Sequence, residues 1–150
     1  MLCVGLLSAC GFHLRGSSQI AERFNPINLQ GDQLSDQQWR QLRSALINAS
    51  ATLTEAEDAP RLRVSINRLK DSKLTSSSSA NVQLIQLGMQ LKFSVLDAQS
   101  NLLIEPQELI QNRTVELDSD NVLSQQDSIN TAQIELEKDL IRSMIYRLQK

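Results

Sequence analysis

The residues Ile85-Gln86-Leu87-Gly88-Met89-Gln90-Leu91-Lys92-Phe93-Ser94-Val95 alternate strictly between apolar side chains and polar or small ones. Successive side chains of a strand point to opposite faces of a sheet, so this period of two predicts a strand with one buried and one wet face. Six apolar positions in a row match the period, which makes this the clearest strand signal in the chain. A sheet organised around this strand is therefore expected.

Further strands are expected before and after this central one. Residues 61–67 alternate in the same way, and the strand continues to about Leu74, with a slip of phase between Ile66 and Leu69 that suggests a bulge. Residues 102–117 predict another strand, interrupted near Pro106 because proline cannot donate to a ladder. Residues 25–29 are a candidate first strand. The polar residues 75–79 and 97–101 are expected to form the connecting loops.

Two segments show helical periodicity. In residues 34–51, Ser35 is placed to cap the helix and Gln38 to reach back to it. Ser128–Gln149 predicts a second helix, with Ser124 or Asp127 as its cap. Its apolar side chains spread over roughly 200° of the helix, wider than one sheet-facing stripe. Either this helix also packs against the first one, or it presents an apolar flank to a partner. The first helix's apolar face is expected to consist of Trp39, Leu42, Ala45, Leu46 and Ala49.

The order strand, helix, three meandering strands, helix predicts an α+β fold. We expect a four-stranded, mostly antiparallel sheet with two helices packed on one face. A chain of 150 residues with 41% apolar content suffices for one domain, which we expect to span residues 25–150.

The composition argues against several classes of function. A net charge of −2 does not supply the basic face that a nucleic acid needs, so no nucleic-acid partner is expected. His13 is the only histidine, and no phosphate loop or metal-ligand spacing is present, so we expect neither an enzyme nor a metal site. The late carboxylates, which are Asp118, Asp120, Asp127, Glu135, Glu137 and Asp139, are interpreted as solvated surface.

Binding remains as the expected kind of function. Seven cations lie on or beside predicted strands, and two interpretations stay open: a basic surface that meets phosphates, or ordinary solubilising charge. They are Arg61, Arg63, Arg68, Lys70, Lys73, Lys92 and Arg113.

The N-terminus carries a processing signal. Leu7-Ser8-Ala9-Cys10 has the form of a bacterial lipobox, which predicts a signal peptide at residues 1–9, diacylglycerol on Cys10 and a lipidated tether at residues 10–24. No Lys or Arg precedes Cys10, so we expect the start to lack its charged n-region. The competing interpretation is an apolar N-terminal strand of a cytosolic enzyme or scaffold with a fortuitous lipobox.

Directly after the lipobox, Cys10-Gly11-Phe12-His13-Leu14-Arg15 resembles the mature N-terminus of the LPS-assembly lipoprotein LptE family. The order of predicted elements through Lys150 is similar as well. The resemblance implies a lipoprotein anchored on the periplasmic side of the outer membrane. It implies a plug that assists assembly of the LptD β-barrel, through which lipopolysaccharide enters the outer leaflet.

The resemblance also implies what the chain binds. Lipopolysaccharide would contact basic residues near the loops of the sheet, which by position are Lys70, Lys73 and Arg113. No cofactor is implied apart from the covalent N-acyl diacylglycerol anchor on Cys10. The alternative is a generic periplasm-facing lipoprotein that binds another envelope partner.

Overall fold

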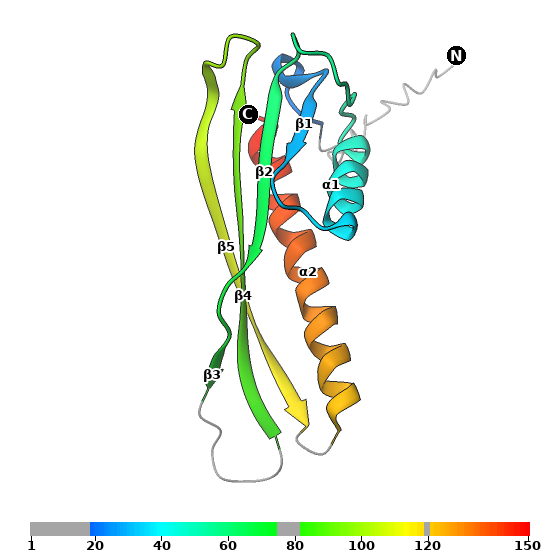
Figure 1. Ribbon diagram of the computed structural model, residues 1–150, viewed down its shortest axis with the longest axis vertical. Coiled ribbons are helices and arrows are strands. Elements are labelled where there is room, and N and C mark those ends of the chain that lie inside the picture. The colour runs from blue at the N-terminus through cyan, green and yellow to red at the C-terminus, as the bar shows by residue number, and fades with distance from the viewer. Residues whose placement is uncertain (1–18, 75–81, 119–120) are drawn as a thin grey trace, which may run out of the picture.

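The computed structural model describes residues 19–74, 82–118 and 121–150. These form a five-stranded sheet with two α-helices along one of its faces (Figure 1). The molecule is elongated, because the longest strands and the second helix run along most of its length. In chain order the elements are the 3-10 turn η1 (Glu22–Phe24), β1 (Asn28–Gly31), α1 (Asp36–Asn48), β2 (Arg61–Arg68), β3 (Ser72–Leu74), β4 (Val82–Leu96), β5 (Leu102–Asp118) and α2 (Val122–Leu148).

β4 is the centre of the sheet. β5 pairs along one edge of β4, whereas β2 and β3 pair one after the other along its opposite edge. β1 adds to the outer side of β2 and makes the only parallel strand pairing in the described part of the chain. The expected α+β class, the mostly antiparallel sheet and the helices on one face are therefore confirmed, with five strands where four were expected.

The additional strand arises from a break in the expected strand at residues 61–74. The backbone N–H of Leu69 donates to the carbonyl of Gly88 at 2.9 Å, and β3 then resumes at Ser72. A Cβ atom on Gly88 would lie 3.2 Å from the Cβ of Leu69, so glycine leaves room for this close approach. Residues 69–71 lie opposite only two residues of β4, 87 and 88, so the slip of phase marks one extra residue in the edge of the sheet, as in the expected bulge, and also the boundary between β2 and β3.

β5 is one continuous strand, but its pairing with β4 is irregular near Pro106, where the interruption was expected. Phe93 pairs with Gln107 and Val95 pairs with Ile104, so two residues of β5, one of them Pro106, lie opposite the single intervening residue of β4. Such an irregularity leaves one residue outside the hydrogen-bonded ladder. Proline suits this position, because it has no backbone N–H to donate.

α1 begins as the sequence predicts. The Ser35 hydroxyl accepts from the Gln38 N–H at 3.2 Å, and the Gln38 side chain accepts from the Ser35 N–H at 3.0 Å. Leu42, Leu46 and Ala49 are buried. The first strand is Asn28–Gly31 and not residues 25–29.

α2 begins six residues earlier than expected, at Val122, and the expected caps Ser124 and Asp127 are wrong. The Asn121 side chain is the cap and accepts from the Ser124 N–H at 3.1 Å. The apolar periodicity of the sequence does not reveal this start, because none of the first ten side chains of the helix is buried. From Ala132 onward one broad face is buried, and it packs against β4, β5 and α1, which confirms the helix-packing interpretation of the wide apolar arc.

The described chain enters the fold between the C-terminal ends of the two helices. The Ile20 N–H donates to the Ala49 carbonyl at 3.1 Å, and the Ala21 N–H donates to the Leu148 carbonyl at 2.8 Å. Ile20 and Phe24, which the sequence pattern assigns to the tether, are buried in the core. The lipobox, Cys10, the N-terminal motif and the serine loop at residues 75–79 lie outside the described residues.

Candidate binding surfaces

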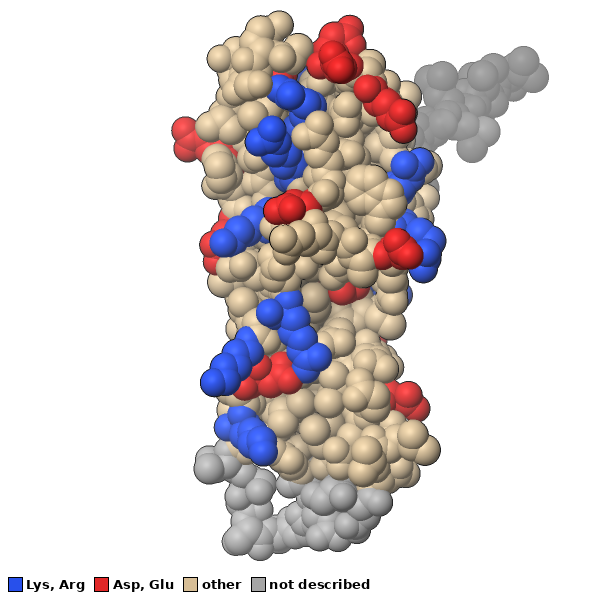
Figure 2. Space-filling model, in the orientation of Figure 1, with Lys and Arg blue, Asp and Glu red and all other residues tan. Residues whose placement is uncertain are grey.

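Lys70 and Lys73 stand at one edge of the sheet. Lys70 lies in the break between β2 and β3, and Lys73 lies on β3 opposite Ile85 of β4. Both side chains are exposed, and neither has an ion-pair partner among the described residues. Figure 2 shows Lys and Arg side chains distributed along the β2 and β3 side of the molecule. This edge therefore offers two uncompensated ammonium groups.

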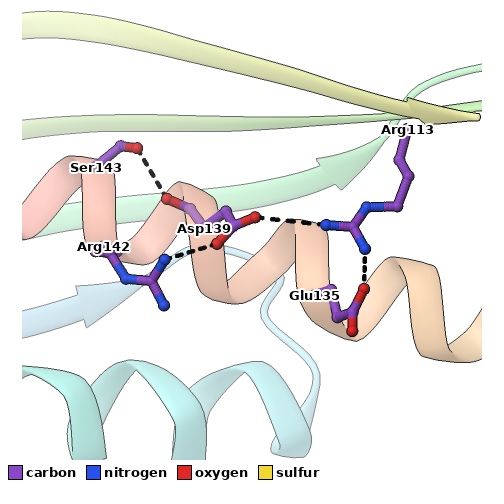
Figure 3. A network of polar contacts seen from close by, with 5 residues as sticks. All are labelled: Arg113, Glu135, Asp139, Arg142 and Ser143. Carbon is purple, nitrogen blue, oxygen red and sulfur yellow. Dashed lines mark hydrogen bonds and ion pairs between the residues drawn. The ribbon is translucent and has the colours of Figure 1, made fainter.

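Arg113, the third predicted contact, has a different environment. Its side chain leaves β5 toward α2, where the guanidinium forms ion pairs with Glu135 and, at 3.7 Å, with Asp139 (Figure 3). Asp139 also binds Arg142 at 2.9 Å, and its backbone carbonyl accepts from the Ser143 hydroxyl at 2.8 Å. The charge of Arg113 is thus compensated by two carboxylates, and its direct role is to join β5 to α2.

The structure does not bring the three predicted residues together. Lys73 and Arg113 lie on the same face of the sheet, but β4 separates them, because Lys73 pairs with Ile85 and Arg113 pairs with Leu87 on opposite edges of that strand. The other cations on strands have partners. Arg61 donates to the Asp97 carbonyl at 3.0 Å, Arg63 to Gln30, Arg68 to Asp71, and Lys92 lies 3.8 Å from Glu108.

A groove of about 800 Å³ runs between α1 and the second half of α2. Its apolar floor includes Ala45, Ile141 and Ile145. Three cations line it, which are Arg40 from α1 and Lys138 and Arg142 from α2, and no carboxylate does. This groove could not be found from the sequence, because its cations come from two helices whose pairing only the fold defines.

A second groove, of about 730 Å³, lies between β5 and the first half of α2. Its charged lining residues are Glu116, Asp127 and Glu135, and no Lys or Arg lines it. The two grooves along α2 therefore carry opposite charge.

A buried carboxylate joins the two helices. Glu137 of α2 is 8% exposed and accepts a hydrogen bond from the Gln38 amide at 2.9 Å. The same Gln38 side chain closes the capping box of α1, so one residue both starts α1 and docks it on α2. Burial raises the pKa of Glu137, and the bond from Gln38 only partly offsets that rise.

Within the described ranges 19–74, 82–118 and 121–150, no cluster of His, Cys, Asp and Glu has the arrangement of a metal site. No helix there is long and apolar enough to span a membrane. What these ranges offer is a set of binding surfaces on an α+β scaffold.

The fold defines a small α+β protein with two charged grooves along α2, and comparison with protein families identifies the family to which it belongs. The model of the LptE family, described as lipopolysaccharide-assembly, matches residues 21–148. The chain belongs to this family, which confirms the resemblance seen in its N-terminal motif. Membership makes it a lipopolysaccharide-assembly lipoprotein of the cell envelope, in a family without enzymatic activity.

Solved structures share the fold. A minor lipoprotein from Acinetobacter baumannii matches with a TM-score of 0.67 and 21% identity, over 84% of this chain and 93% of that one. An uncharacterized lipoprotein B from Nitrosomonas europaea matches with a TM-score of 0.70 and 18% identity, over 93% and 90%. The rare lipoprotein B from Shewanella oneidensis matches with 0.67 and 18%, over 82% and 92%. No curated protein sequence matches significantly.

Proposed function

We propose that this chain is the lipid-anchored outer-membrane partner of LptD, that it occupies the lumen of that β-barrel and assists its assembly, and that the pair inserts lipopolysaccharide into the outer leaflet. The observation that carries the proposal is the family match over residues 21–148, which covers almost the whole packed fold. The lipobox and the motif at residues 10–15 support it independently, because they lie outside the matched range.

In this proposal residues 1–9 are removed, Cys10 is acylated, and the residues between Cys10 and the buried Ile20 tether the packed domain, whose core includes Ile20 and Phe24 of the expected tether. Several acyl chains on one cysteine anchor a protein firmly, whereas a single chain binds only marginally. Eight residues, 11–18, lie between Cys10 and Gln19, so nine steps of the chain join the two. A chain of that length spans at most about 30 Å. The end of the molecule where both helices finish would therefore stay close to the membrane surface.

The wet face of the sheet suits a polar lumen. On β4 this face carries Gln86, Gln90, Lys92 and Ser94, and on the paired strand it carries Asn112 and Thr114. The interiors of large barrels are polar and are plugged in some proteins, so this mostly polar face, on which Ile110 is also exposed, can pack against such an interior.

Lipopolysaccharide contact is proposed at Lys70 and Lys73, with Arg113 in a secondary role. The two lysines are exposed and uncompensated, so their charge is available to an anionic group. Arg113 would first have to leave Glu135 and Asp139.

Two measurements test the function. Metabolic labelling with palmitate should tag the wild-type protein and not Cys10→Ser, whereas an unlabelled wild type would reject every lipoprotein function. Purification from envelope membranes should then recover LptD in about equal amount. Recovery of a labelled protein without LptD would reject the plug and favour the generic lipoprotein with another envelope partner.

A separate measurement tests the lipopolysaccharide contact. Lys70→Ala/Lys73→Ala should weaken binding to lipopolysaccharide-containing vesicles more than Arg113→Ala does. The matched control is Arg63→Ala/Lys92→Ala, which removes the same charge from cations that already have partners. Equal losses in the two double variants would reject a specific contact at Lys70 and Lys73.

A further inference from the structure

A carboxylate lies in the middle of the basic edge at which Lys70 and Lys73 stand. Asp71 falls between the two lysines in the sequence. Arg68, the last residue of β2, and Lys73 of β3 lie opposite residues of β4 that are four positions apart along one edge of that strand. Four positions of a strand span about 13 Å. Asp71 therefore has cations on both sides, and the charge that this edge presents depends on which cation its carboxylate binds.

The carboxylate of Asp71 binds Arg68. The guanidinium donates from Nε to one carboxylate oxygen at 3.2 Å and from a terminal nitrogen to the other oxygen at 2.5 Å. A bidentate pair of this kind is stronger and more specific in its geometry than a single ion pair. Neither Lys70 nor Lys73 takes part in an ion pair within the described ranges. The negative charge of Asp71 is thus neutralised by Arg68, and both ammonium groups stay uncompensated.

A further contact holds the Arg68 guanidinium in place. Arg68 lies on the helix-covered face of the sheet, because it pairs with Met89 and the Met89 side chain is buried. Gln133 of α2, with its amide oxygen turned toward the guanidinium, accepts from Nε at 3.0 Å and from a terminal nitrogen of Arg68. The arginine is therefore tied to α2 as well as to Asp71.

We propose that Arg68 is a positioning residue for anion binding, which keeps the Asp71 carboxylate away from Lys70 and Lys73 so that both lysines can meet anionic groups of lipopolysaccharide. The inference rests on the proposed function, because it takes the two lysines as the contact. Without Arg68, the cations beside the released carboxylate are these lysines. An ion pair between Asp71 and either lysine would cancel half of the uncompensated charge at this edge.

Binding of the full acylated protein to lipopolysaccharide-containing vesicles tests the inference. We expect Arg68→Gln to raise the dissociation constant about fivefold, which is the effect of one exposed ion pair. Asp71→Asn alone should change it by less than about twofold, because both lysines are already uncompensated and Gln133 still holds Arg68. Arg68→Gln/Asp71→Asn should bind within about twofold of the wild type, because the carboxylate that would pair with a lysine is gone.

The matched control is Arg68→Gln/Glu57→Gln, which restores the same net charge but takes it from an exposed carboxylate before the other end of β2. We expect this variant to bind as weakly as Arg68→Gln. Rescue by the control, or a gain from Asp71→Asn as large as the loss from Arg68→Gln, would mean that only the summed charge matters and overturns the inference.

The two lysines separate this inference from the contact on which it rests. If Lys70→Ala/Lys73→Ala weakens binding and Arg68→Gln binds like the wild type, the role of Arg68 is overturned and the proposed contact stands. If Lys70→Ala/Lys73→Ala binds like the wild type, the contact and the role of Arg68 are both overturned.

Discussion

The two halves of α2 differ although they belong to one uninterrupted helix. The first ten residues, 122–131, bury no side chain, and Leu123 is 80% exposed. The second half buries a broad face that includes Leu140 and Met144, both fully buried. The groove beside the first half is acidic, and the groove beside the second half is basic. The helix therefore completes the core at one end and extends beyond it at the other.

This difference in packing indicates that the second half of α2 contributes more to the stability of the fold than the first half. α1 covers only the second half of α2, so that half has a helix on one side and the sheet on the other (Figure 1). The first half has only the end of the sheet beside it. In the sequence, residues 122–134 contain a single charged side chain, Asp127. Figure 2 shows a broad area without charged side chains toward this end of the molecule.

The largest expected effect is on the free energy of unfolding, and it differs between substitutions in the two halves of α2. Leu140→Ala should lower the free energy of unfolding by about 2–5 kcal/mol, because it leaves a cavity in the core. Leu123→Ala is the matched control at an exposed position and should change it by less than about 0.5 kcal/mol. Chemical denaturation measures both, and similar losses would contradict the division of the helix.

The next prediction compares the N-terminal caps of α1 and α2. Ser35→Ala should lower the free energy of global unfolding by about 1 kcal/mol, because α1 packs on the core from its first turns. Asn121→Ala removes an equivalent cap from the half that buries nothing. Hydrogen exchange should detect opening of the first turns of α2 while global stability stays nearly constant. A global loss as large as that of Ser35→Ala would show that the first half is part of the cooperative core.

Glu137 makes the junction between α1 and α2 sensitive to pH. Burial raises the pKa of this carboxyl in the folded state, so the folded protein holds its proton at pH values where the unfolded chain has released it. Its contribution to stability is therefore largest at acid pH and is lost as pH rises from the ordinary glutamate range through the raised pKa. Glu137→Gln keeps an acceptor for Gln38 and should be more stable at neutral pH, with a flatter pH profile. Denaturation from pH 4 to pH 8 checks this sign, and an unchanged profile would contradict it.

The smallest expected effect is at the link between β5 and α2. Arg113→Ala removes two ion pairs between half-exposed side chains and should lower stability by about 1 kcal/mol or less. The loss should shrink at high salt, because screening weakens the pairs in the wild type. A loss of several kcal/mol, or one insensitive to salt, would mean that packing of the arginine stem dominates.

Much of the fold could be predicted because its signals are local. The period of two marks β4, and the Ser35 and Gln38 pair marks the start of α1, since both depend on residues a few positions apart. The start of α2 was missed because a helical turn that buries nothing has no apolar period. The division of residues 61–74 into β2 and β3 could not be predicted, because it depends on the approach of Leu69 to Gly88, which is distant in sequence.

The candidate sites also divide into those that the sequence shows and those that depend on the fold. The lipobox and the N-terminal motif are contiguous, so the sequence by itself determined the predicted anchor and the family, and its patterns determined the fold class. Lys70 and Lys73 could be named from the family resemblance and their positions near the predicted loops, but only the tertiary structure separated them from the paired Arg113. It alone placed Arg40 opposite Lys138, because the charge of a groove between two helices depends on which faces pack together, and long-range burial decides that.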